Sequence, residues 1–104
     1  MQAQEISSGN VYADLEQKDA EMMQLKAQLC LKIEASLLLQ GLSQRDAAKL
    51  TGVSQAKFSN MLRGEFRGIS EAKMMQCLTR LGHSVQIRVS AKPIGENFGQ
   101  LAVV

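Results

Sequence analysis

Polar and small side chains recur between positions 55 and 63 at the spacings that share one face of a helix. Amide side chains make paired hydrogen bonds with the edge of an adenine base, and positive charges neutralise phosphate. Such a face predicts contact with the major groove of DNA, whereas a helical hairpin with an ordinary polar outer face is the alternative. The residues of this face are Gln55, Ala56, Ser59, Asn60 and Arg63, with Lys57 on its flank.

A glycine interrupts the apolar pattern immediately before this face. Gly52 can adopt the left-handed backbone that a tight turn requires, and Ser54 follows as a helix-capping residue. Val53 and Phe58 have the spacing of a hydrophobic staple, which fixes the direction in which the chain enters a helix. The spacing predicts a helix-turn-helix, in which a helix capped by Ser43 packs against the helix that presents the polar face.

Two further helices are expected to hold this motif. A long helix is expected over residues 20–40, capped by Asp19 and ended by Gly41. Another is expected from a cap at Ser70 to Leu81. The long helix carries apolar residues at steps of three and four, which predicts a buried stripe. This stripe consists of Met22, Leu25, Leu29, Ile33 and Leu37.

The apolar period changes after Gly82. Apolar and polar residues alternate over residues 84–90, which predicts a half-buried strand that ends before Pro93. A lone strand leaves unpaired backbone groups, so we expect it to pair with the same strand of a second copy. The alternatives are that residues 100–104 fold back as the missing strand or that a partner protein supplies it. The expected dimer-interface residues are Val85, Ile87 and Val89.

The expected fold is therefore mainly α: a compact helical bundle that contains the helix-turn-helix and carries one C-terminal β-strand. With 104 residues, the chain has the length of one domain. We expect residues 1–10 to be a flexible tail and residues 11–82 to be the helical DNA-binding domain. Residues 83–93 are expected to be the dimerisation strand, and residues 94–104 a C-terminal tail.

Charge is unevenly distributed along the chain. Residues 1–42 carry three Lys or Arg against six Asp or Glu, a charge of −3. Residues 43–68 carry five against two, a charge of +3. A basic middle beside an acidic front predicts an anionic partner and a second, different partner, unless both are ordinary solvated faces.

The sequence offers little support for catalysis, metal binding or membrane insertion. The single histidine, His83, belongs to no catalytic or metal-binding pattern, so we expect no enzyme activity, cofactor or metal. Cys30 and Cys77 lie in helical patterns and are expected to be reduced core residues. We expect a cytoplasmic protein, because there is no apolar run of about 18 residues and no pattern of a secretory signal at the N-terminus.

The stretch LSQRDAAKLTGVSQAKFSNMLRG, residues 42–64, resembles the helix-turn-helix of the XRE group, the class of phage Cro and lambda-type repressors. The flanks NVYADLEQKDAEMMQLKAQLCLKI and LGHSVQIRVSAKP are similar to XRE-type antitoxins of the HigA kind, so the resemblance covers residues 10–93. The residues that match the helix-turn-helix pattern are Gln44, Ala48, Gly52, Val53, Ser54, Gln55, Phe58 and Gly64.

This resemblance implies a cytosolic bacterial or phage protein that binds an operator and represses its own operon. The homodimer expected from the strand would match a palindromic operator, and we expect the protein to be associated with the nucleoid. An antitoxin would also neutralise a RelE-like or HigB-like ribonuclease toxin; a stand-alone phage- or plasmid-type repressor is the alternative. The acidic front favours an antitoxin, because a ribonuclease has a basic surface that an acidic partner could cover. The resemblance assigns base reading to Gln55, Ala56, Lys57, Ser59 and Asn60. Together with the basic middle, it assigns phosphate contacts to Gln44, Arg45, Arg63 and Arg67.

Overall fold

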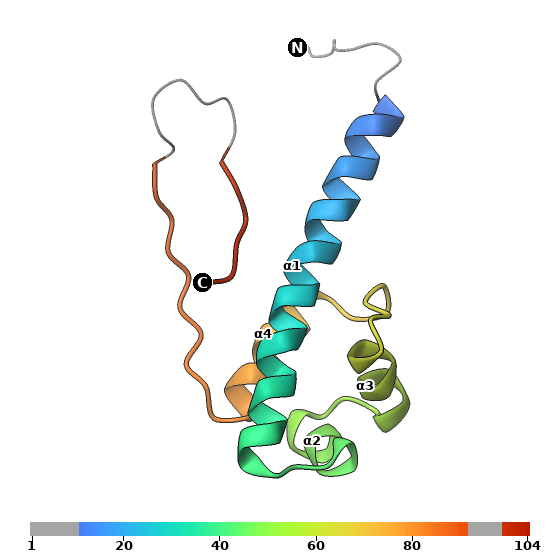
Figure 1. Ribbon diagram of the computed structural model, residues 1–104, viewed down its shortest axis with the longest axis vertical. Coiled ribbons are helices and arrows are strands. Elements are labelled where there is room, and N and C mark those ends of the chain that lie inside the picture. Colours follow the sequence, from blue (N-terminus) through green and yellow to red (C-terminus); the bar gives the residue numbers. More distant parts are fainter. Residues whose placement is uncertain (1–10, 92–98) are drawn as a thin grey trace.

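The computed structural model describes residues 11–91 and 99–104, and in this part of the chain it contains four α-helices (Figure 1). The longest, α1 (Val11–Gln40), forms the spine of the molecule. α4 (Glu71–Arg80) packs along its C-terminal half, and Gln40 Nε2 donates a hydrogen bond of 2.7 Å to the carbonyl of Leu81 at the end of α4. These two helices lie far apart in the sequence, and the helical segment between them packs against both.

The two short helices between them lie at the C-terminal end of α1. They are α2 (Gln44–Thr51) and α3 (Gln55–Leu62), and they pack against each other across the turn at Gly52 (Figure 1). The predicted helix-turn-helix in a mainly helical fold is therefore confirmed.

A serine begins each of the three short helices. Its Oγ accepts a hydrogen bond from the backbone N–H three residues later, at 3.1, 3.2 and 3.0 Å in α2, α3 and α4. Each bond satisfies one of the N–H groups that a helix start otherwise leaves without a partner. The capping residues are Ser43, Ser54 and Ser70, as the sequence predicted.

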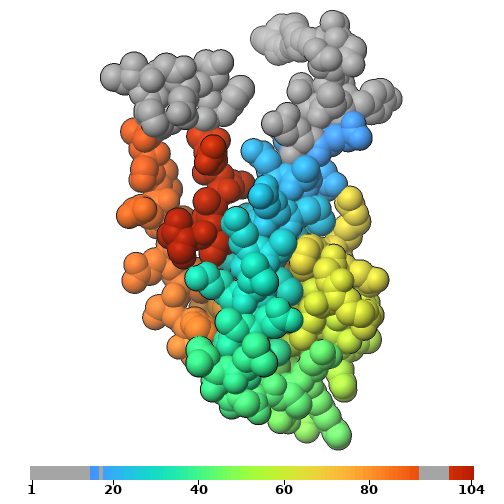
Figure 2. All heavy atoms as spheres, viewed as in Figure 1, coloured from blue at the N-terminus to red at the C-terminus, as the bar shows by residue number. Residues whose placement is uncertain are grey.

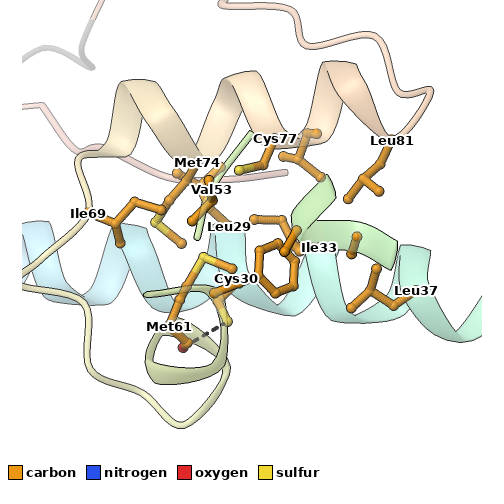
Figure 3. Packing of buried hydrophobic residues seen from close by; sticks show 14 residues of the cluster. Leu29, Cys30, Ile33, Leu37, Val53, Met61, Ile69, Met74, Cys77 and Leu81 are labelled. Carbon is orange, nitrogen blue, oxygen red and sulfur yellow. Dashed lines mark hydrogen bonds between the residues drawn. The ribbon is translucent and has the colours of Figure 1, made fainter. Parts of the chain in front are cut away.

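All four helices contribute side chains to one buried core (Figure 3). Leu29, Ile33 and Leu37 of the predicted stripe are buried, whereas Met22 and Leu25 near the start of the core are partly exposed. Each fully buried large apolar side chain stabilises the fold by about 1.5–3 kcal/mol. The fully buried residues of this kind are Ile33, Phe58, Met61 and Met74.

The start of α1 was predicted wrongly. The helix begins at Val11, not at position 20, and Asp19 lies inside it instead of capping it. No glycine or proline occurs between Val11 and Gln40, so nothing in the sequence stops the helix from extending toward the N-terminus. Asp19 instead bonds to Arg67, on the loop that follows α3.

The C-terminal strand was also predicted wrongly. Residues 84–90 form no strand within the described parts of the chain; they run as an irregular arm away from α4 (Figure 1). Residues 99–104 do fold back, but they lie toward α1 (Figure 2), and the N–H of Val103 donates to Gln28 Oε1 at 3.0 Å. A strand exists only where a second backbone completes its ladder, and neither described segment supplies one to the other.

Three expectations fall wholly or partly outside the described residues. They are the flexible tail over residues 1–10, the end of the strand at Pro93, and the first part of the C-terminal tail at residues 94–98.

Candidate nucleic-acid interface

The turn between α2 and α3 directs the outer face of α3 away from the core. Gly52 has φ +76°, a left-handed conformation, and its N–H donates to the carbonyl of Ala48 at 2.9 Å. Val53 and Phe58, the predicted staple, are both buried, with 6% and 0% of their surface exposed. With one side of α3 fixed in this way, its opposite side faces solvent.

The predicted base-reading residues lie on that outer side. Gln55, Ala56 and Lys57 in the first turn are exposed, whereas Ser59 and Asn60 in the second turn are partly buried. The first turn of α3 is therefore the part most open to a partner, in keeping with recognition helices that contact bases through their N-terminal residues.

Arg63 covers the second turn. Its Nη1 donates to Ser59 Oγ at 2.9 Å and its Nη2 donates to Asn60 Oδ1. An amide oxygen has two lone pairs, so Asn60 Oδ1 can accept from a base while Arg63 holds it. Arg63 thus orients two of the predicted base-reading residues, a role that its spacing alone did not predict.

Two residues that are predicted to contact phosphate lie at the start of α2. Gln44 and Arg45 are both exposed, and Arg45 shares a shallow hollow of about 470 Å³ with Gln55 of α3. Exposed polar and cationic side chains of this kind contact the DNA backbone, and Arg45 lies beside the open first turn of α3.

The remaining predicted phosphate contact, Arg67, is already paired. Its Nη2 and Nη1 donate to the two carboxylate oxygens of Asp19 at 2.7 and 3.2 Å. This hydrogen bond is the main reason that the pKa of Asp19 is lowered from its ordinary value, and the same bond raises the pKa of Arg67. Both groups are therefore charged at neutral pH.

A second, larger hollow of about 630 Å³ lies beside α3. α3 contributes Lys57 and Asn60 to its lining, the loop after α3 contributes Arg67, and α1 contributes Met23. Lys26 of α1, which is 8% exposed, anchors this loop by donating from Nζ to the carbonyl of Phe66 at 3.0 Å. This contribution of α1 could not be predicted from local spacing, because the two contacting residues lie 40 positions apart in the sequence.

The predicted dimer residues are not brought together into a strand face. Val85 is partly buried against the core, whereas Ile87 and Val89 are 77% and 91% exposed on the arm. α1 carries a second set of exposed apolar residues that sequence analysis missed. They are Leu31, Leu38 and Leu39, which are 64%, 80% and 85% exposed.

Both cysteines are buried and free, which confirms the expected core positions. Burial raises the pKa of each thiol, and Cys30 Sγ donates to the carbonyl of Met61 at 3.4 Å (Figure 3). Among the residues that the structure describes, no three His, Cys, Asp or Glu side chains gather as metal ligands would. No helix in those residues is long and apolar enough to cross a membrane.

Comparisons with known proteins agree with this geometry. A family model described as a helix-turn-helix domain matches residues 11–90, which include the four described helices and the arm over residues 84–90. A solved structure of a protein assigned to the XRE family as a transcriptional regulator has a TM-score of 0.76 and 31% sequence identity to this chain. The match covers 83% of this chain and 97% of that one. No curated protein matches the sequence.

Proposed function

This chain belongs to the helix-turn-helix domain family and is of the XRE type, and on that premise we propose that it is a DNA-binding transcriptional repressor. The observation that carries the proposal is the open first turn of α3, with Gln55, Ala56 and Lys57 exposed on a helix that is fixed from behind by Phe58. A major groove about 12 Å wide admits one α-helix, and such a face is suited to base edges inside it.

Each side chain then has a distinct role. The amides of Gln55 and Asn60 would hydrogen-bond to base edges, with Lys57 and Ser59 beside them, and the methyl group of Ala56 would contact a thymine methyl. Backbone phosphates would be held from both sides of the groove. The residues for these contacts are Gln44 and Arg45 at the start of α2, and Arg63 and Arg67 after α3.

Selection of bound duplexes from a random-sequence pool tests base reading directly. The wild-type protein should enrich one related set of sequences. A variant with Gln55, Asn60 and Arg63 all changed to Ala should bind the pool more weakly and enrich none. If the wild type enriched no sequence, base reading by α3 would be ruled out.

We propose further that the protein acts as a homodimer on a palindromic operator. The support is the arm over residues 84–90, where the apolar side chains of Ile87 and Val89 are open to a second copy. Contact between the apolar side chains of two arms about a two-fold axis would set two α3 helices for half-sites about 34 Å apart, or a multiple of that distance.

The proposed cellular role is that of an antitoxin, which would neutralise a RelE-like ribonuclease toxin and repress its own operon in the cytoplasm. Two observations support a protein partner: the acidic charge of residues 1–42 and the exposed leucines of α1. A stand-alone repressor is the second candidate, favoured by a basic charge concentrated on residues 43–68.

Co-expression with the product of the neighbouring open reading frame separates these two candidates. An antitoxin should co-purify with that product and protect cells from it, also when Gln55, Asn60 and Arg63 are all changed to Ala. A stand-alone repressor should bind its operator and form no complex with the neighbour.

A further inference from the structure

We propose that Asp19 of α1 competes with the DNA backbone for Arg67 and thereby limits the affinity of this interface. The inference rests on the proposed function, because it takes Arg67 to be a phosphate contact. It adds a residue outside the helix-turn-helix that acts against binding.

The pair has the geometry of a phosphate contact. The two terminal nitrogens of Arg67 meet the two carboxylate oxygens of Asp19 at 2.7 and 3.2 Å, as an arginine fork meets two phosphate oxygens. Arg67 cannot present the same pair of nitrogens to a phosphate while Asp19 holds them. The carboxylate therefore stands where a phosphate would have to bind.

The pair also lies close to the reading face. Arg67 lines the hollow beside α3 together with Lys57 and Asn60, and Met23, one turn beyond Asp19 on α1, lines it as well. DNA that enters this hollow from α3 thus meets the guanidinium of Arg67, to which Asp19 is bonded. A carboxylate that stays in place also repels the incoming phosphate, since two like charges at short range oppose each other.

The pair is accessible to exchange. The side chain of Arg67 is 74% exposed and that of Asp19 is 46% exposed, so a phosphate can approach the guanidinium from solvent. Exposed ion pairs of this kind are weak enough to be replaced by another anion. A buried pair would instead be a fixed part of the fold.

A second contact holds the loop independently of Asp19. The buried amine of Lys26 donates to the carbonyl of Phe66 at 3.0 Å, next to Arg67 in the chain. The loop is thereby anchored to α1 without the ion pair, so the fold does not require an acidic group at position 19. Loss of Asp19 should free Arg67 and leave its position nearly unchanged.

The test compares Asp19→Asn with Glu21→Gln, a matched variant that removes one negative charge from an exposed position of the same helix. The probe is a DNA duplex of mixed sequence, because phosphate contacts do not depend on sequence. Asp19→Asn should bind about two- to fivefold more tightly than Glu21→Gln, the effect of releasing one exposed ion pair. In an Arg67→Ala background, the two substitutions should have equal effects.

Equal affinities of Asp19→Asn and Glu21→Gln in the wild-type background would overturn the competition and leave the proposed function standing. Weaker binding by Asp19→Asn, together with a lower melting temperature, would overturn it in favour of a purely structural ion pair. If the wild-type protein bound the mixed duplex but selected no sequence, base reading by α3 would be ruled out. The comparison of Asp19→Asn with Glu21→Gln would still test the competition for Arg67. If the wild-type protein bound no duplex at all, both the proposed DNA-binding function and the competition by Asp19 would be ruled out.

Discussion

Arg63 has two roles on α3 that substitution can separate. It adds positive charge beside the groove, and its guanidinium orients Ser59 and Asn60 through the bonds described above. A charge contact strengthens binding to every sequence, whereas an oriented amide strengthens binding to one. The two roles therefore predict different results for affinity and for sequence preference.

We expect Gln55→Ala or Asn60→Ala to lose about 1–3 kcal/mol at the selected operator and to bind mixed duplex almost as the wild type does. Arg63→Ala should weaken binding to both, with the larger loss at the operator because Asn60 is no longer oriented, and should reduce the slope of log K against log salt by about 0.9. Fluorescence anisotropy across a salt series measures both quantities. Gln76→Ala, at an exposed glutamine on α4, is the control for loss of an amide. Equal losses on operator and mixed duplex for Gln55→Ala would contradict its role in base reading.

At the level of single residues, the sequence predicted what local spacing determines. The face of α3 follows from helical geometry alone, so Gln55 and Lys57 were found to be exposed as expected. The partner of Arg67 could not be found in this way, because 48 residues separate it from Asp19 and the pair forms only once α1 and the loop pack together. An aspartate before a helical stretch also resembles a cap, which concealed its actual role.

At the level of helices and turns, substitution of Gly52 tests whether the turn between α2 and α3 requires glycine. A Cβ added at this position would meet no atom within 4 Å, so only the left-handed backbone opposes another residue. We expect Gly52→Ala to lower the free energy of unfolding by about 1–2 kcal/mol, the cost of that conformation for an L-residue. Gly52→Asn should cost less, since asparagine tolerates it better. Urea denaturation measures the difference.

Gly68→Ala is the matched control for this prediction. A Cβ there also meets no atom within 4 Å, and the backbone of Gly68 is not left-handed. This substitution should leave stability unchanged or raise it by about 0.4–1 kcal/mol, because alanine restricts the unfolded chain. Equal destabilisation at both glycines would show that lost flexibility, and not the sign of φ, is what matters.

The helix starts that carry a local signal were predicted, and the elements that depend on distant partners were not. Ser43, Ser54 and Ser70 each cap a helix through a hydrogen bond within three residues. The arm over residues 84–90 has the alternation of a strand, but alternation cannot supply the second backbone. The start of α1 was predicted wrongly because the sequence offers two residues of the capping type, Asn10 and Asp19, and the helix begins after the earlier one.

For the whole molecule, the exposed arm leads to a prediction about oligomeric state. We expect the wild type to be a dimer at micromolar concentration and Ile87→Pro to be monomeric, because proline removes both a backbone donor and an exposed apolar side chain. Sedimentation equilibrium measures the change, and binding to a palindromic operator should weaken with it. Leu101→Pro changes a similarly exposed apolar residue, 64% exposed, in the segment 99–104 and is the control. A wild type that stays monomeric without DNA or toxin would defeat the dimer proposal.

The packing of α1 against α4 has a consequence for synthesis on the ribosome. α1 leaves the ribosome first, but its partner at the far end of the core, Leu81, follows Gln40 by 41 residues. At about 5–20 residues per second, that interval is roughly 2–8 s. α2, α3 and the turn between them are made within this interval and supply Val53, Phe58 and Met61, but Met74, Cys77 and Leu78 of α4, which complete the core around Leu29, Ile33 and Leu37, come only at its end. The core of the nascent chain therefore stays incomplete, and open to chaperones and to aggregation, until α4 emerges.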